Sequence, residues 1–146
     1  MAPHVSLGGN RSRTFIDTNI LVYTDDPRDP VKQTKAVQLI RDLMSTRVGT
    51  VSLQVLQEYF TTATGRLKLA ADIAKQRVEA FALMHVMEPA LADILAAIDF
   101  HRLHRVSFWD ALILRAAKQS GCRLLLSEDL QHGQIVDGVR IVNPFL

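Results

Sequence analysis

Four acidic residues in this sequence occupy positions where distant parts of a chain can meet: Asp17, Glu58, Asp110 and Asp129. Asp17 and Asp129 each follow a short apolar run that predicts a buried strand, and Asp110 lies in the first turn of a predicted helix. In a doubly wound sheet, strand ends and helix starts meet at one edge, where such folds bind ligands. We therefore expect these carboxylates to converge on one site.

A cluster of this kind needs a positive charge among its members. Two carboxylates about 4 Å apart repel by roughly 4 kcal/mol at an effective dielectric constant of about 20. A divalent cation would remove this repulsion, and an all-oxygen set of ligands favours Mg²⁺ or Mn²⁺ over zinc. The pattern thus predicts a metal site suited to phosphate chemistry.

Each acid also has an ordinary structural explanation. Asp17 could cap the helical turn after it, and Glu58, at the edge of an apolar stripe, could simply be solvated. Asp110 stands three residues after Ser107, a near capping box in which the carboxylate reaches back to a free amide. Asp129 could form a turn. The joint pattern of four acids, rather than any one of them, favours a site.

Two adjacent acids, Glu128 and Asp129, compete for the fourth position at the end of a predicted strand. Side chains alternate along an extended chain, so Ser127 and Asp129 share one side while Glu128 points to the other. This alternation favours Asp129 as the fourth member of the cluster.

The elements that must position these acids alternate between strands and helices. Apolar runs bounded by turn residues predict strands at 14–16, 48–51, 85–88, 124–126 and 139–142. Apolar spacings of three and four predict a helical turn at 19–23 and helices at 31–45, 52–63, 70–84, from 89 onward and at 107–120. This alternation implies right-handed crossovers and a central parallel sheet of four to five strands. We expect a three-layer α/β/α domain over 14–146, preceded by a flexible polar tail at 1–13.

Apolar stripes of two helices are predicted to face the core. Their members are Leu91, Ile94, Leu95 and Ile98 in the first helix and Trp109, Leu112, Ile113 and Ala116 in the second. Between the two helices, residues 101–106 predict a basic connector. Its two histidines could suggest zinc, but no Cys or third His has a suitable spacing.

Length and composition indicate one globular domain that needs no disulfide. The chain has 146 residues, 48% of them apolar and 22% charged. Its single cysteine, Cys122, excludes an intramolecular disulfide and suits a reducing, cytoplasmic location. No apolar run approaches the roughly 18 residues of a membrane span. The net charge of +2 is mild, but a surface surrounding four gathered acids would be more basic, which suits a polyanion.

The motifs around the acids together resemble the PIN domain family. They are Phe15-Ile16-Asp17-Thr18-Asn19, the mid-chain Glu58, Phe108-Trp109-Asp110-Ala111, and Leu126-Ser127-Glu128-Asp129-Leu130-Gln131-His132-Gly133. The resemblance covers residues 14–146, and the nearest subset is the VapC-like ribonuclease toxins of prokaryotic toxin–antitoxin pairs. It implies that Asp17, Glu58, Asp110 and Asp129 are the catalytic and metal-binding acids, supported by Asn19 and Ser127.

The resemblance also implies what the protein does. Members of this subset are Mg²⁺- or Mn²⁺-dependent endoribonucleases that act on tRNA, rRNA or mRNA, are often dimeric and are held inactive by a cognate antitoxin. In-line attack by water would leave a 5′-phosphate and a 3′-hydroxyl.

The helices at 31–45 and 52–63, which carry Tyr59 and Phe60, have apolar surfaces that could form a homodimer or an antitoxin groove.

Basic residues could supply a track for the RNA backbone. The candidates are Arg66, Lys68, Arg102, Arg105, Arg115 and Lys118, and the densest group lies at 101–105.

Two other functions remain open from the sequence. Another Mg²⁺-dependent phosphohydrolase, such as a phosphatase, would need an Asp-x-Asp pair and a downstream Lys, whereas Asp17 is followed by Thr18 and Asn19. A non-catalytic RNA-binding or interaction module would not need four acids. A nuclease assay with Mg²⁺, compared with EDTA, separates these classes.

Overall fold

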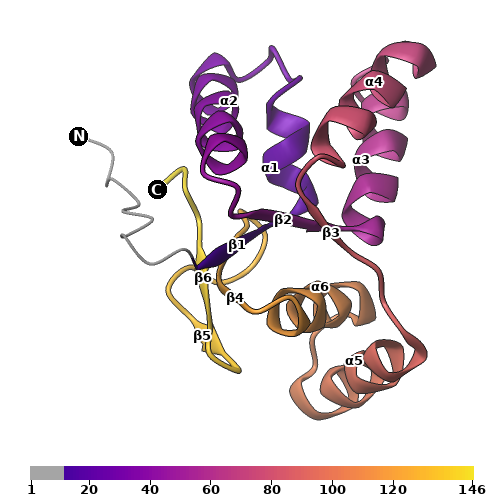
Figure 1. Ribbon diagram of the computed structural model, residues 1–146, viewed down its shortest axis with the longest axis vertical. Helices are drawn as coiled ribbons and strands as arrows, with labels where there is room; N and C mark the ends of the chain where they lie inside the picture. Colours follow the sequence, from indigo (N-terminus) through magenta and orange to yellow (C-terminus); the bar gives the residue numbers. More distant parts are fainter. Residues whose placement is uncertain (1–11) are drawn as a thin grey trace.

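A mostly parallel sheet runs through the middle of the computed structural model, which describes residues 12–146 (Figure 1). Its strands in the described residues are β1 (Arg13–Ile16), β2 (Gly49–Ser52), β3 (His85–Met87), β4 (Cys122–Leu126), β5 (Ile135–Val136) and β6 (Val139–Val142). They lie in the order β3-β2-β1-β4-β6-β5, and only the β5–β6 pair is antiparallel. The predicted parallel sheet is confirmed, with one strand more than expected.

The extra strand, β5, has only two residues and therefore no periodicity to recognise. It joins β6 through Asp137 and Gly138, both of which have positive φ angles, 49° and 82°. Two central residues with positive φ are typical of a tight hairpin turn. The predicted tail lies outside the described residues except for Ser12 and Arg13, and Arg13 already begins β1.

Helices cover both faces of the sheet. Within the described chain they are α1 (Thr18–Tyr23), α2 (Pro30–Ser45), α3 (Leu53–Gly65), α4 (Ala71–Phe81), α5 (Leu91–His104) and α6 (Phe108–Gln119). Figure 1 shows α1 to α4 together on one face and α5 and α6 on the other. The predicted three-layer α/β/α architecture is confirmed. No helix in the part that the structure describes is long and apolar enough to cross a membrane.

The predicted connector at 101–106 is wrong over its first four residues, because α5 continues to His104 and ends at Arg105 in the left-handed conformation (φ 54°). Cationic side chains in the last helical turn favour this extension, since they face the negative end of the helix dipole.

The apolar stripe of α5 is not a core face. Leu91 is 70% exposed and Leu95 52%, whereas Ala97 is fully buried against Ala111 and Leu112 of α6. The helix packs on its neighbour through Ala97 and the partly buried Phe100, so Leu91 and Leu95 lie outside this contact. In α6 the predicted stripe is confirmed except at Trp109, which is exposed.

The strand register places the acids that follow β1 and β4 side by side. Phe15 lies beside Leu125, and Ile16 beside Leu126, in parallel neighbouring strands whose side chains are buried. The residues after the two strands, Asp17 and Ser127, therefore emerge at the same edge of the sheet.

Candidate active site

The centre of the site is the contact between the ends of β1 and β4. The backbone amide of Asp17 donates to the carbonyl of Leu126 at 3.0 Å, and the Ser127 hydroxyl donates to Asp17 Oδ2 at 2.8 Å. The other Asp17 oxygen accepts the amide of Thr18 at 2.7 Å, so Asp17 also caps α1. Its capping role and its place in the site are compatible.

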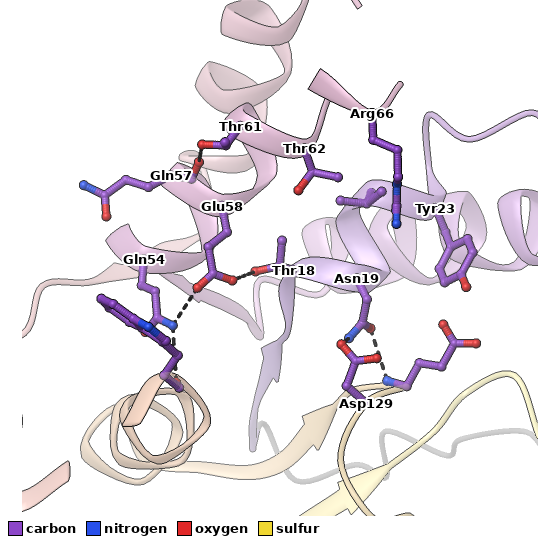
Figure 2. Close-up of a pocket in the computed structure, with 13 residues that line it drawn as sticks. Thr18, Asn19, Tyr23, Gln54, Gln57, Glu58, Thr61, Thr62, Arg66 and Asp129 are labelled. Carbon is purple, nitrogen blue, oxygen red and sulfur yellow. Dashed lines mark hydrogen bonds between the residues drawn. The ribbon is translucent and has the colours of Figure 1, made fainter. Parts of the chain in front are cut away.

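Asn19 of α1 connects the loop after β4 to this centre. Its Nδ2 donates to Asp129 Oδ2 at 3.0 Å and lies 3.4 Å from Asp17 Oδ2. Its Oδ1 accepts the amide of Glu128 at 3.1 Å. Figure 2 shows Asn19 and Asp129 facing each other, joined by this hydrogen bond. One amide side chain thus orients both the acid and the backbone beside it.

Glu58 of α3 reaches the site from the opposite side. Its Oε2 accepts the Thr18 hydroxyl at 2.9 Å, and its Oε1 accepts Gln54 Nε2 at 2.8 Å (Figure 2). Gln54 Nε2 also lies 3.3 Å from the carbonyl oxygen of Trp109. Gln54 therefore links α3 to the first turn of α6.

Asp110 lies beside this network rather than within it. Its backbone amide donates to the Ser107 hydroxyl at 3.0 Å, as expected for the start of α6. Its carboxylate makes no hydrogen bond or ion pair with another residue of 12–146. Shared polar partners join three of the four predicted acids, Asp17, Glu58 and Asp129. Asp110 follows Trp109, whose carbonyl Gln54 contacts, but shares no partner with them.

Burial makes Asp17 the unusual acid of the site. Its side chain is buried, and this loss of solvation raises its pKa from 3.8 to about 6. Hydrogen bonds from Ser127 and Thr18 act in the opposite direction, and the negative charges of Asp129 and Glu58 add to the rise. No Lys or Arg of the described chain pairs with any of the four acids. Their charges are uncompensated.

Glu128 differs from Asp129 in having a cationic partner. Lys32 of α2 forms an ion pair with Glu128, and its ammonium also lies 3.3 Å from the Tyr23 hydroxyl. Asp129 instead accepts from the neutral amide of Asn19. The two adjacent acids therefore have different surroundings, and only Glu128 is already neutralised by the protein.

The donor chemistry of the four acids fits Mg²⁺ or Mn²⁺. All ligating atoms would be oxygens without cationic partners, which hard divalent cations prefer. As they lie, no three His, Cys, Asp or Glu side chains of residues 12–146 form a group that could hold one ion. Hydrogen bonds from Thr18 and Asn19 hold Glu58 and Asp129, so these carboxylates would have to turn toward an ion to ligate it.

A groove of about 700 Å³ opens beside the acids, within the size range of small-molecule and substrate sites. It runs between α1, α3, the start of α6 and the loop after β4 (Figure 2). Its lining residues are Thr18, Asn19, Val22, Tyr23, Gln54, Gln57, Glu58, Thr61, Thr62, Arg66, Trp109, Glu128 and Asp129.

Among the predicted RNA contacts, only Arg66 lines this groove. Lys68 is exposed just beyond α3, and Arg105 is exposed at the end of α5. Arg102 is exposed and pairs with Asp99 at 3.5 Å.

Two further candidates on α6 have partners of their own. Arg115 donates to the buried Asp93 at 2.9 Å, and Lys118 lies 3.6 Å from Asp137. Arg115 thus has a clear structural partner away from the groove.

Sequence reasoning missed the neutral polar residues that α3 adds to the groove. Gln54, Glu58 and Thr61 or Thr62 recur at spacings of three and four, so they form a polar stripe on one side of α3. This spacing can be read from the sequence, but it indicates a site only once the opposite wall of the groove is known.

The PIN domain family matches residues 14–137, which include all four acids. The chain therefore belongs to the PIN domain family. No curated protein sequence matches it significantly.

Three solved structures share the fold. VapC20 of Mycobacterium tuberculosis, described as a toxin that cleaves the sarcin-ricin loop, is 20% identical, with a TM-score of 0.64 over 80% of this chain and 91% of that one. A toxin–antitoxin complex from Klebsiella pneumoniae is 16% identical (TM-score 0.64; 90% and 97% covered). A DNA-bound VapBC complex from Salmonella typhimurium is 19% identical (TM-score 0.65; 89% and 96% covered).

Proposed function

We propose that this PIN domain protein is a metal-dependent endoribonuclease and the toxin of a type II toxin–antitoxin pair. The observation that carries the proposal is the network of uncompensated acids at the edge of the sheet, with Asp17 buried among them. The names of the three structural neighbours, which describe an RNA-cleaving toxin and two toxin–antitoxin assemblies, support the choice of RNA and of an antitoxin partner.

In this proposal Asp17, Glu58, Asp110 and Asp129 hold Mg²⁺ or Mn²⁺. Such an ion would supply Lewis-acid polarisation of the scissile phosphate and a more acidic water molecule. The protein's own contribution is orientation, because hydrogen bonds hold Glu58 and Asp129 beside the site, from where their carboxylates would turn to the ion.

Three neutral side chains supply that orientation. Ser127 fixes one oxygen of Asp17, Asn19 positions Asp129, and Gln54 positions Glu58. Arg66, which caps the end of α3 and lines the groove, would contact a phosphate of the bound strand.

The direct test is cleavage of mixed cellular RNA by the purified protein in Mg²⁺ or Mn²⁺, compared with EDTA. Asp17→Asn keeps the shape and the capping hydrogen bond but removes the charge, so cleavage should disappear while the folded spectrum is retained. Cleavage that survives both EDTA and this substitution would exclude the proposed mechanism. Binding of RNA without any cleavage would instead favour the non-catalytic module.

The partner proposal has a separate basis and test. Exposed apolar side chains of α5, among them Leu91, Leu95 and Leu103, add to Val31 of α2 and Phe60 of α3. We propose that homodimerisation and a cognate antitoxin cover apolar surface of this kind. Light scattering of the protein alone should give a dimer, and co-expression with the adjacent gene product should give a larger complex without RNA cleavage. A strict monomer that no neighbouring gene product binds would contradict this.

A further inference from the structure

One aromatic side chain of the groove is exposed where the sequence predicts burial. Trp109, in the first turn of α6, is 60% exposed, while Leu112, Ile113 and Ala116 of the same helix are buried. With this exposed fraction, the Trp109 side chain presents a large part of its surface to solvent. An exposed indole does not contribute the free energy that its burial would give. Apolar residues that depart from the core pattern in this way are expected at functional sites.

We propose that Trp109 is a stacking platform for an unpaired RNA base beside the phosphate on which the acids act, an inference that rests on the function proposed above. Trp109 lines the same groove as Glu58 and Asp129. Its carbonyl oxygen lies 3.3 Å from Gln54 Nε2, and the same nitrogen donates to Glu58 at 2.8 Å. One buried amide thus fixes the backbone of the platform relative to an acid of the site.

The indole also has a side-chain neighbour that limits how it can turn. The rings of Phe108 and Trp109 make an edge contact, with centroids 5.0 Å apart and planes at 66°. Phe108 itself packs against Ala97 and Ala111 between α5 and α6. The platform is therefore attached to the fold by both its backbone and its ring.

The other groove walls favour a nucleotide over a protein segment as the occupant. Gln57, Thr61 and Thr62 present amide and hydroxyl groups that can hydrogen-bond to base edges, and Arg66 can contact a phosphate. The cores of protein interfaces are depleted of charged residues, whereas this lining holds Glu58, Arg66 and Asp129. Stacking on an aromatic ring adds affinity that depends little on base identity.

The second aromatic residue of the groove is already engaged. Lys32 Nζ lies 5.0 Å from the centroid of the Tyr23 ring, and Phe145 makes an edge contact with the same ring at 5.0 Å. Of the two aromatic side chains in the described lining, Trp109 is the more exposed. Because bases in a duplex are stacked on each other, the platform selects single strands, loops or bulges.

The test uses the fact that the chain contains one tryptophan. In EDTA, where cleavage is suppressed, a short single-stranded RNA should quench the tryptophan fluorescence, and the same strand annealed to its complement should quench it far less. By polarisation of a labelled RNA, Trp109→Ala should weaken single-strand binding by about 10- to 100-fold, and Trp109→Phe by much less. Ile135→Ala, which removes a 59% exposed apolar side chain of β5 outside the groove lining, is the matched control and should bind as wild type.

Several results would overturn the inference. Equal quenching by single-stranded and duplex RNA, or unchanged RNA affinity of Trp109→Ala with a wild-type melting temperature, would exclude a stacking platform. Conversion of a dimer to a monomer by Trp109→Ala, with RNA affinity intact, would assign the indole to a protein interface. Because RNA binding is measured without the metal, the two proposals can fail separately. Stacking without metal-dependent cleavage would support this inference and contradict the nuclease proposal. Cleavage without stacking would support the nuclease proposal and contradict this inference.

Discussion

Two buried aspartates in this molecule have opposite electrostatic surroundings. Asp93 accepts the Ala90 amide at 2.8 Å and the Arg115 guanidinium at 2.9 Å, and these contacts lower its pKa. Asp17 is buried to a similar degree, but it has no cationic partner among residues 12–146, and burial raises its pKa. Asp93 therefore stabilises the junction of α5 with α6, whereas Asp17 is held ionisable at a cost in stability. Burial alone does not mark a functional acid; burial without compensation does.

The largest expected effect separates the two aspartates by activity. Asp17→Asn should reduce metal-dependent RNA cleavage by at least about 100-fold, because one ligand charge is lost. Asp93→Asn should leave the cleavage rate per folded molecule within a few-fold of wild type. Rates are measured under single-turnover conditions with the folded fraction determined in parallel. Equal losses of cleavage rate in the two variants would show that Asp17 and Asp93 do not differ in their role in catalysis.

The second prediction concerns stability, where Asp93→Asn should have the larger effect and Asp17→Asn the smaller. Asp93→Asn leaves Arg115, itself 26% exposed at its side chain, without its ion-pair partner. The free energy of unfolding should fall by about 2–4 kcal/mol. Urea titration at pH 7 with EDTA measures it. Asp17→Asn should not lose stability in the same titration, and a comparable loss there would show that Asp17 has a mainly structural role.

The third prediction concerns pH in the absence of metal. The pKa of Asp17 is about 6 in the folded protein against an ordinary 3.8, so the folded state binds more protons than the unfolded state between these values. Stability from this group therefore falls as pH rises from about 4 to about 6, by roughly 3 kcal/mol in all. For Asp93, whose pKa is lowered, stability is instead lost as pH falls below the ordinary aspartate range.

The difference in unfolding free energy between Asp17→Asn and wild type isolates the first effect. In EDTA, the unfolding free energy of the variant minus that of wild type should increase between pH 4 and pH 6 and stay constant above pH 6. A difference that does not change with pH would mean that Asp17 titrates normally in the folded protein.

The smallest expected effect tests the neighbouring pair Glu128 and Asp129. Glu128→Gln breaks the contact with Lys32, but the pair is partly exposed and Lys32 keeps the Tyr23 hydroxyl, so stability should fall by no more than about 1 kcal/mol. Cleavage should remain within about fivefold of wild type, a change of about 1 kcal/mol in barrier. Asp129→Asn should impair cleavage much more; the opposite ranking would identify Glu128 as the fourth acid.

The sequence predicts the arrangement of strands well because buried parallel strands are short apolar runs with turn residues at both ends. The ends of β1 and β4 follow directly. The alternation of strands and helices predicts a parallel sheet but not its strand order, so the proximity of Asp17 and Ser127 is seen only in the structure.

Helix orientation is where sequence reasoning is weaker. An apolar stripe shows which side of a helix avoids water but not whether the same chain covers that side. Leu91 and Leu95 of α5 and Trp109 of α6 fit core patterns and yet are exposed. Likewise, Thr18 and Gln54 join the site only because α1, α3 and α6 come together in the fold.

The most direct test of the uncompensated acid cluster is Mn²⁺ binding at neutral pH, measured by calorimetry or by the electron paramagnetic resonance signal of the free ion. Wild type and Asp93→Asn should bind Mn²⁺ saturably with similar affinity, and Asp17→Asn should bind at least about 10-fold more weakly. Equal affinity of wild type and Asp17→Asn, or no saturable binding to wild type, would contradict the account.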